Sequence, residues 1–261
     1  MPQEKINIYS EHEIAGVRRA AQAAAQVLQR LCEAVRPGLS TLDVDNLAGE
    51  YIRETGGTSG SYHYHGFPRQ ICVSLNDEVV HGIGRADRII MPGDLVKLDV
   101  VVTLGGYNGD TARTVCAGGC PAPLAKSLMD ATSDALAAGI AAARDGNCIN
   151  DIGRAVERVA RASGFSTVRD MVGHGCGRHM HEPPEVPNFS VFGKTPRLRP
   201  GMIICIEPMV NAGRYPIEVD ASDRWTTRTR DNSLSAHFEH QILITPQEPE
   251  ILTLWPKTAS N

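Results

Sequence analysis

Acidic residues lie within segments that are otherwise apolar. Asp99 interrupts the run LVKLDVVV, Glu207 interrupts MIICIEPMV, and Glu239 lies in SLSAHFEHQILIT; each run predicts a β-strand. A carboxylate buried in such a strand costs several kcal/mol unless it is paired. Asp110 is a fourth acid of this kind, and the group predicts either raised pKa values or cations bound among the carboxylates.

Asp110 is separated from Asp99 by a predicted hairpin. The segment VVTLGGYNGDTARTV contains two extended runs joined by Gly105–Gly106, which is typical of a two-residue turn. This register places Asp110 opposite Val101 and on the same face as Asp99, one cross-strand diagonal away. Carboxylates ~5 to 8 Å apart can share one metal ion or bridge two. Gly109 permits close approach of a backbone or ligand beside Asp110.

The segment GHGCGRHMHEPPEVPNF contains three histidines, His174, His179 and His181. Its HEPPE part differs from the HExxH zinc motif, because the fifth residue is Glu185 and Pro183–Pro184 prevents a helix. Glycines on both sides of His174 predict a mobile backbone that allows close approach, and they make this residue the candidate metal ligand. Oxygen ligands with one imidazole suit Mn, Fe, Co or Zn in a paired site.

The elements that position these residues form a repeat. Amphipathic helices are predicted from Glu11 to Val35 and after the capping box Ser40–Asp43, and equivalent helices are predicted from about Leu124 to Arg144 and from Asn150 to about Ala162. Matching residues in the two helix pairs are 108 positions apart: Arg36 and Arg144, Gly38 and Gly146, Asp43 and Asp151, Gly56 and Gly164.

The same offset continues into the strands. PGDLVKLDVVV, from Pro92, aligns with PGMIICIEPMV, from Pro200, and this alignment places Asp99 on Glu207. A constant offset through two helices and a strand predicts a duplicated helix-helix-strand unit. We therefore expect residues 1–261 to form a single domain with halves at about 11–115 and 123–245, and a site on the pseudo-twofold axis.

The composition disfavours several classes of function. The chain has 261 residues and a net charge of only −4, which argues against a basic nucleic-acid surface. The N-terminal MPQEKINIYSEHE lacks the features of a secretory signal, and no apolar run approaches membrane-spanning length. Seven scattered cysteines favour a reducing compartment. Cys116 and Cys120 would need a second cysteine pair to form a structural zinc site.

Together these motifs resemble type I methionine aminopeptidases over about residues 10 to 255, which is nearly the whole chain. The resemblance rests on SLNDEVVHGIG, LVKLDVVVTLGGYNGDTART, VGHGCGRHMHEPPEVPN, MIICIEPM and WTTRTRDNSLSAHFEHQILIT. It implies the α+β pita-bread fold, in which a pseudo-twofold axis relates two helix-helix-strand units and helices cover a curved antiparallel sheet.

The resemblance also implies a dinuclear metal site. By position, Asp99 would chelate one metal ion, Asp110 and Glu239 would bridge both ions, and His174 and Glu207 would complete the coordination of the second. Two divalent ions per chain are implied, with Co, Mn, Fe(II), Ni and Zn all acceptable to such ligands. The ions would activate a water molecule as the nucleophile.

The substrate-facing residues implied by the resemblance are His81 and His181, with Glu207 as the proton shuttle. The implied methionine pocket consists of Tyr64, His65, Phe67, Cys72 and Trp225. Two positions differ from the family pattern: Ser61 stands where many relatives carry cysteine, and Met180 stands where an aromatic residue is common. The third histidine of the segment, His179, matches no functional position.

The implied activity is removal of the N-terminal methionine from nascent polypeptides whose second residue is small. The implied setting is the cytoplasm, with transient ribosome association, a monomeric state and no direct binding of nucleic acid or membranes. One alternative is a proline-directed peptidase of the same fold, which usually carries an extra N-terminal domain, whereas the first repeat here begins by about residue 11. The other is a non-catalytic binding module, which the complete ligand set disfavours.

Overall fold

The computed structural model describes residues 5–119 and 121–255, so Cys120 lies outside the described residues. The α-helices of these ranges are α1 (Glu11–Ala34), α2 (Thr41–Glu54), α3 (Pro123–Ala142) and α4 (Ile149–Ala162). The strands of the first half are β1 (Thr58–Ser59), β2 (Cys72–Leu75), β3 (Glu78–Val80), β4 (Leu95–Leu104) and β5 (Tyr107–Cys116), with a 3-10 turn, η1 (Tyr64–Gly66), between β1 and β2.

The strands described in the second half have five residues or fewer. They are β6 (Ser166–Thr167), β7 (Gly173–Gly175), β8 (Glu182–Val186), β9 (Ile203–Ile206), β10 (Met209–Asn211), β11 (Ile217–Val219), β12 (Thr227–Thr229), β13 (Ser235–His237), β14 (His240–Leu243) and β15 (Glu250–Ile251). Within the described ranges, no helix is both long enough and apolar enough to span a membrane.

The helices begin and end within two residues of the predicted bounds. At the start of α2, the Asp43 N–H donates to Ser40 Oγ at 3.0 Å and the Ser40 N–H donates to Asp43 Oδ2 at 2.8 Å, so the predicted capping box is confirmed. The apolar stripe of α1 faces the sheet, where Leu28 and Leu31 are fully buried. Burial of each such leucine stabilises the fold by about 2 kcal/mol.

The strand pairs among the described residues are all antiparallel, as the fold class predicts. In the first half, β4 pairs with β5 along one edge and with β2 and β1 along the other. In the second half, β9 lies in a five-stranded sheet of order β15-β14-β9-β7-β8, and β10 lies between β13 and β6. The remaining sheet has the order β11-β12-β3 and joins the two halves.

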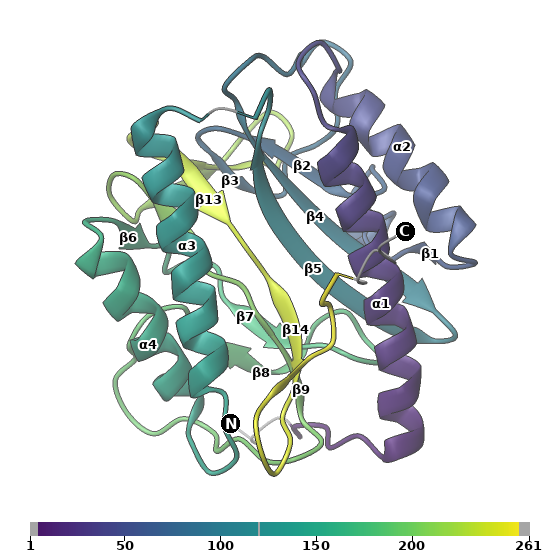
Figure 1. The fold of residues 1–261 in the computed structure, drawn as a ribbon, viewed down its shortest axis with the longest axis vertical. Helices are drawn as coiled ribbons and strands as arrows, with labels where there is room; N and C mark the ends of the chain where they lie inside the picture. Colours follow the sequence, from purple (N-terminus) through teal and green to yellow (C-terminus); the bar gives the residue numbers. More distant parts are fainter. Residues whose placement is uncertain (1–4, 120, 256–261) are drawn as a thin grey trace, which may run out of the picture.

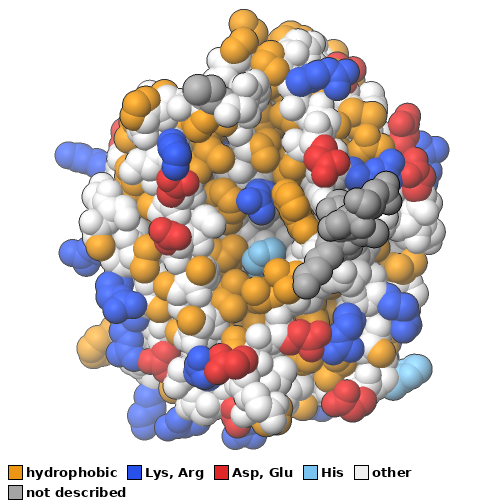
Figure 2. Space-filling view, in the orientation of Figure 1, with side chains coloured by type: hydrophobic (Ala, Val, Ile, Leu, Met, Phe, Trp, Pro, Cys, Tyr) orange, Lys and Arg blue, Asp and Glu red, His pale blue; other side chains and the backbone are white. Residues whose placement is uncertain are grey.

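The helices form a layer on one face of the strands. Figure 1 shows α1 and α2 over the strands of the first half and α3 and α4 over those of the second. On this helical face, hydrophobic side chains gather along the middle and charged side chains lie mainly around the rim (Figure 2). Each helix pair packs on an apolar core of its own.

The offset of 108 residues recurs in the three-dimensional structure. Helices α2 and α4 have equal lengths of 14 residues and start at Thr41 and Ile149. The isolated bridge between Ser40 and Ile89 has its counterpart between Cys148 and Arg197. The β1–β4 pairing has its counterpart in the β6–β10 pairing, with equivalent registers. We propose on these grounds that residues 1–261 form one domain whose halves, about 11–115 and 123–245, are copies of one unit.

The β4–β5 hairpin has the predicted register. Leu104 pairs with Tyr107 across the Gly105–Gly106 turn, and Val101 pairs with Asp110. Asp99 pairs with Ala112 on the same strands, so the two acids lie on one face as a diagonal pair. The predicted geometry of this carboxylate pair is therefore confirmed.

The strands expected to contain Glu207 and Glu239 are each interrupted at the acid. Glu207 and Pro208 separate β9 from β10, and Phe238 and Glu239 separate β13 from β14. Pro208 has no N–H to donate to a neighbouring strand. At this residue the chain passes from the five-stranded sheet, which contains β9, to the three-stranded sheet β13-β10-β6. The prediction of two continuous strands was wrong, because apolar composition extends across the break without showing it.

Gly109 is the point at which α1 crosses β5. A Cβ atom at Gly109 would overlap the backbone of Ala20 and Ala21 in α1. We expect Gly109→Ala to lower the free energy of unfolding by about 3 kcal/mol, because overpacking against backbone forces the helix away from the sheet. Urea unfolding followed by circular dichroism measures this change.

The control for this substitution is Gly49→Ala in α2. A Cβ atom at Gly49 would contact only the flexible side chain of Gln70, with the nearest atom at 3.1 Å. Alanine favours the helix by about 1 kcal/mol over glycine, so this variant should be neutral or slightly stabilised. Equal stability of the Gly109 and Gly49 variants would contradict the close packing of α1 on β5.

Candidate active site

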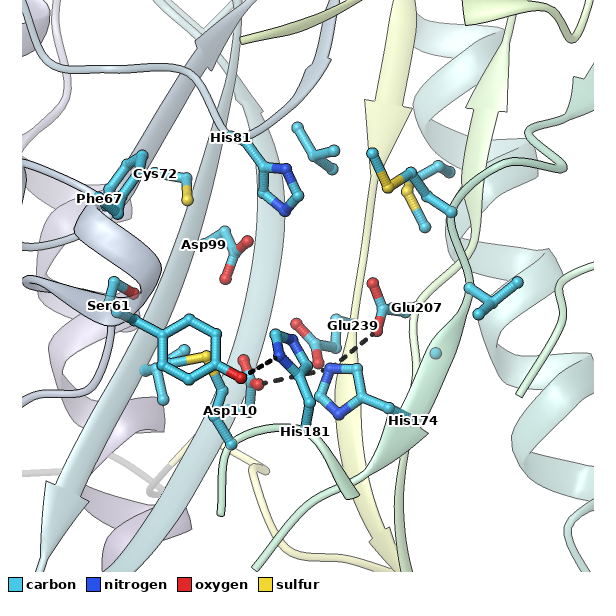
Figure 3. A pocket seen from close by; sticks show the side chains of 18 of the residues that line it. Ser61, Phe67, Cys72, His81, Asp99, Asp110, His174, His181, Glu207 and Glu239 are labelled. Atoms are coloured by element: carbon cyan, nitrogen blue, oxygen red, sulfur yellow. Dashed lines mark hydrogen bonds and ion pairs between the residues drawn. The ribbon is translucent and has the colours of Figure 1, made fainter. Parts of the chain in front are cut away.

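Five candidate metal ligands converge from both halves of the molecule, on the face of the strands away from the helices (Figure 3). Asp99 on β4 and Asp110 on β5 come from the first half. His174 on β7 comes from the second half, with Glu207 and Glu239 from the two strand breaks. The structure thus brings together all five residues that the sequence nominated.

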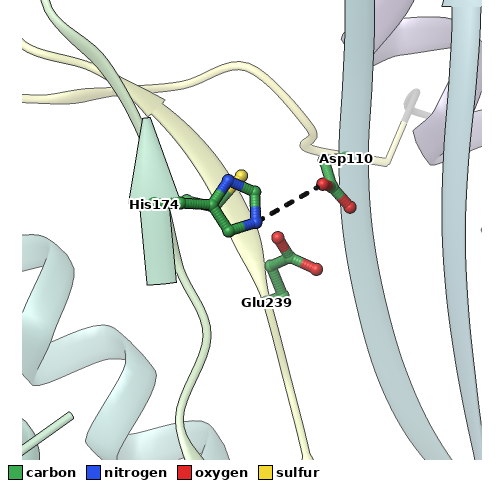
Figure 4. Close-up of side chains that lie close together, drawn as sticks. Asp110, His174 and Glu239 are labelled. Atoms are coloured by element: carbon green, nitrogen blue, oxygen red, sulfur yellow. Dashed lines mark ion pairs between the residues drawn. The ribbon is translucent and has the colours of Figure 1, made fainter. Parts of the chain in front are cut away.

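The distances in this group are short. His174 Nε2 lies 3.3 Å from Glu207 Oε1 and 3.9 Å from Asp110 Oδ2. Ligand atoms of Asp110, His174 and Glu239, together with the thiol of Cys205, all lie within 4.8 Å of one another (Figure 4). A single ion of ordinary size can contact several atoms of such a group.

Hydrogen bonds between the two halves hold Glu239 against β5. The Glu239 N–H donates to the carbonyl oxygen of Ala112 at 2.9 Å, and the Thr111 hydroxyl donates to the carbonyl oxygen of Glu239 at 2.9 Å. Asp110 immediately precedes Thr111 on β5. Two hydrogen bonds to the backbone of Glu239, one of them from a side chain, therefore hold its carboxylate near that of Asp110 across the boundary between the halves.

His174 lies in a strand rather than in a mobile loop. Strand β7 pairs with β8 and with β9, and Gly175 lies opposite Ile204. A Cβ atom at Gly173 would overlap the carbonyl oxygen of Cys205, and one at Gly175 would overlap that of Pro183. The prediction of close approach is confirmed and that of mobility was wrong, because these glycines admit neighbouring strands on both sides.

Burial raises the pKa values of the four acids. It raises the pKa of Asp99 to about 7 and that of Asp110 well above its usual range, where the neighbouring charge of Asp99 adds to the effect. Burial is also the main cause of the raised pKa values of Glu207 and Glu239, followed by repulsion from Asp110. The cluster is thus unfavourable in its ionised form without added positive charge.

The histidines near the acids do not supply that charge. Burial, followed by repulsion from His181, lowers the pKa of His174 to about 3 and that of His81 to about 4. The pKa of His181 is also lowered, by burial and then by His65. These imidazoles are neutral at neutral pH, so they are available as metal ligands or as neutral hydrogen-bond partners.

The residues present fit a pair of divalent metal ions. Within the described part of the chain, Glu207 Oε1 and Glu239 Oε1 are buried without a hydrogen-bond partner. Buried carboxylate oxygens without donors are strongly destabilising, and cations between them remove the penalty. Four carboxylates and one neutral imidazole are the ligand types expected for first-row divalent ions.

The ligands line one side of a cavity of about 630 Å³. Its other walls include the residues implied as a methionine pocket, namely Tyr64, His65, Phe67, Cys72 and Trp225, as well as Ser61, His81, Met180 and His181. Phe67 and Trp225 meet edge to face with ring centroids 5.2 Å apart. The apolar side chains Val80, Val101, Met171 and Met209 also line the cavity, and no motif in the sequence indicates this.

His181 is fixed at the mouth of this cavity. The Tyr64 hydroxyl lies 2.8 Å from His181 Nδ1, and the His181 and His174 rings are 4.3 Å apart between centroids. His179, two residues earlier, is exposed and is not among the residues that line the cavity. The three histidines of the segment GHGCGRHMHEPPEVPNF therefore differ: one is a candidate metal ligand, one is a substrate-facing candidate and one is a surface residue.

Two residues near the ligands were not assigned from the sequence. Cys205 lies directly opposite His174 in the β7–β9 pair, and His237 Nε2 lies 3.8 Å from Glu207 Oε2. Each is two residues before a ligand candidate, Glu207 and Glu239 respectively. The alternation of side chains along a strand was a signal that could have identified both residues.

We expect metal binding to release protons. Asp99, with a pKa of about 7, is more than half protonated in the metal-free protein at pH 6.5, and the raised pKa values of Asp110, Glu207 and Glu239 favour protonation of those acids as well. Ligation requires ionised carboxylates, so affinity should rise with pH by about tenfold per unit for each proton released. Calorimetric titration with Mn²⁺ in buffers of different ionisation enthalpy measures the proton number.

Asp99→Asn is the matched control for the proton count. The amide removes one titrating group without changing the size of the side chain, so the variant should release fewer protons at pH 6.5. Heats that are independent of the buffer in the unsubstituted protein would show that the carboxylates are already ionised, contrary to this prediction.

Comparisons with known proteins agree with this geometry. Residues 15–246 match metallopeptidase family M24. Methionine aminopeptidase A of Synechocystis sp. is 42% identical over 251 residues, which cover 96% of this chain and 98% of that protein. The crystal structure of methionine aminopeptidase from Rickettsia prowazekii superposes with a TM-score of 0.93 at 38% identity, covering 96% of this chain and 100% of that one.

The methionine aminopeptidase structure from Thermotoga maritima gives a similar result. Its TM-score is 0.92 at 36% identity, with coverage of 95% of this chain and 99% of that chain. The match to the family extends through both halves and includes all five ligand candidates. On the evidence of sequence, fold and site together, the chain belongs to metallopeptidase family M24.

Proposed function

We propose that this protein is a metal-dependent aminopeptidase that removes the N-terminal methionine of polypeptides whose second residue is small. The observation that carries the proposal is the placement of four carboxylates and one imidazole on one wall of a cavity whose remaining walls are largely apolar and aromatic. Relatives named methionine aminopeptidase, at about 40% identity over 95% of the chain or more, support the choice of substrate.

The metal ligands of the proposed enzyme are the five residues that converge in the cavity. Asp99 would hold one ion, Asp110 and Glu239 would contact both ions, and His174 and Glu207 would complete the second. When bound, the divalent ions supply Lewis acidity and an acidified water nucleophile. Mn, Fe(II), Co, Ni and Zn all suit these ligands, so metal supply determines which ion is used.

His181 would contact the carbonyl oxygen of the scissile peptide. Its lowered pKa keeps the ring neutral. The Tyr64 hydroxyl, whose pKa burial raises, donates to Nδ1 in this assignment, so the ring proton lies on Nε2. An Nε2–H at the cavity mouth can stabilise the negative charge that develops on the carbonyl oxygen.

Two further residues would handle protons and the leaving group. His81 lines the cavity beside Trp225, with 6.4 Å between ring centroids, and would contact the nitrogen of the scissile peptide. Glu207 would move a proton from water to that nitrogen, because one of its oxygens faces His174 and has no donor among the described residues. The cavity wall formed by Phe67, Cys72 and Trp225 would receive the methionine side chain.

The polypeptide partners are newly made chains that retain their initiator methionine. We propose that the protein meets them in the cytoplasm and associates transiently with the ribosome. Sedimentation of the purified protein with ribosomes, compared with sedimentation in 0.5 M salt, tests that association.

A hydrolysis panel tests the activity directly. We expect apo-protein reconstituted anaerobically with each divalent ion to cleave Met-Ala-Ser, to cleave Met-Leu-Ser at least 100-fold more slowly because the second side chain is bulky, and to leave Gly-Pro and Ala-Pro-Ala intact. Asp110→Asn is the inactive control. Cleavage of only the proline substrates would identify a proline-directed peptidase instead. If no substrate were cleaved with any ion, the alternative of a non-catalytic binding module would be favoured.

Tyr64→Phe tests the orientation of His181. Loss of the hydroxyl frees Nδ1 and lets the ring change tautomer, so we expect kcat for Met-Ala-Ser to fall about tenfold with little change in thermal stability. Steady-state kinetics and a thermal melt measure the two effects.

Tyr62→Phe is the matched control for this variant. Tyr62 precedes the same turn, is exposed and is not among the residues that line the cavity. Its variant should retain the full kcat. A Tyr64→Phe variant with unchanged kcat would show that the hydrogen bond to His181 has no part in the reaction.

A further inference from the structure

His237 is a buried histidine beside the site to which the proposed mechanism assigns no role. Its side chain is 2% exposed, and it lies on β13 opposite Met209. Its backbone is fixed to β5: the His237 N–H donates to Thr114 Oγ1 at 2.9 Å, and the Thr114 hydroxyl donates to the His237 carbonyl oxygen at 2.8 Å. These bonds fix the backbone, and burial leaves the imidazole little room to change its rotamer.

The imidazole is directed at Glu207. His237 Nε2 lies 3.8 Å from Glu207 Oε2, while Glu207 Oε1 lies 3.3 Å from His174 Nε2. Among the described residues, neither ring nitrogen of His237 has a hydrogen-bond partner. The Glu207 carboxylate is therefore located between two imidazoles, one on each oxygen.

The chemistry of the pair favours a hydrogen bond. A neutral imidazole carries one N–H, and an adjacent carboxylate oxygen favours the tautomer with that proton on Nε2. A shift of about 0.8 Å brings Nε2 and Oε2 within hydrogen-bonding distance, which a small side-chain rotation supplies. A bond from a neutral donor to a carboxylate is stronger than one between neutral groups, and it fixes the plane of the carboxylate.

We infer that His237 is a positioning residue for Glu207: its Nε2–H holds Oε2 and thereby directs Oε1 toward His174 and the metal site. The inference rests on the proposed function, in which Glu207 ligates a metal ion and moves a proton. Donors that orient metal-ligating carboxylates typically change metal affinity or activity by about 10- to 100-fold when they are removed.

Two substitutions separate hydrogen bonding from packing. Glutamine at this position retains an N–H donor, whereas leucine fills the space without one. We expect His237→Leu to lower kcat for Met-Ala-Ser by about 10- to 100-fold with KM within about twofold, and to weaken one of two calorimetric Mn²⁺-binding steps by about tenfold. His237→Gln should retain kcat and both binding steps within about fivefold.

His240 supplies the matched control. It is three residues further on, and its Nδ1 already contacts Thr253 Oγ1 at 2.8 Å, away from the site. His240→Leu should lower the melting temperature. Its kcat should stay within about twofold of the kcat of the unsubstituted enzyme. Nitrogen-15 NMR of the Zn²⁺-loaded protein, in which ligation keeps Glu207 ionised and we expect His237 to be protonated on Nε2, gives a readout that is independent of activity.

The outcomes distinguish this inference from the proposed function. If the unsubstituted protein fails to cleave Met-Ala-Ser, the proposed function fails, while the tautomer and the Mn²⁺ affinities still report on His237. If the protein is active and His237→Leu keeps kcat and both Mn²⁺ affinities within threefold, the inference is overturned. It is also overturned if the leucine and glutamine variants lose equal activity and equal thermal stability, because His237 would then act only by packing.

Discussion

The structure depends on a cluster of carboxylates that repel one another. Asp99, Asp110, Glu207 and Glu239 face one space, and burial raises the pKa of each. Folding buries these groups only because hydrophobic contacts elsewhere outweigh the cost of removing them from water. Each half supplies its own core for this purpose, built on α1 and α2 in one half and on α3 and α4 in the other. Divalent ions bound among the carboxylates compensate their negative charge. The unfavourable free energy of the metal-free site therefore favours metal binding.

Much of this arrangement was readable from the sequence. The helices follow from amphipathic stripes and capping residues, and the register of β4 with β5 follows from Gly105–Gly106. The pairing of Asp99 with Asp110 therefore follows from the sequence alone. The offset of 108 residues added Glu207 to this pair, and strand context and flanking glycines nominated Glu239 and His174. The family resemblance then assigned each of these residues to one or both metal ions.

The remainder depends on contacts between segments far apart in the chain. The breaks at Glu207 and Glu239 arise where strands pass between sheets, and apolar composition is the same on both sides of such a break. No single motif of the sequence assigns a role to His237, because its position beside Glu207 depends on bonds to Thr114 in the other half. The prediction of a mobile segment around His174 was also wrong. In the sequence, Gly173 and Gly175 indicate mobility, but in the structure they allow β8 and β9 to pack closely on both sides of β7.

The hydrogen bonds that join β5 to the segment of His237 and Glu239 also have a kinetic consequence. Hinged enzymes close around a substrate by rotating about a boundary that few bonds cross, and the opening of that boundary often limits turnover. Here four bonds, made by Thr111, Ala112 and Thr114, cross the boundary at the ligands themselves. These bonds oppose rotation of one half against the other at this point, so the ligands are held in place before a substrate arrives.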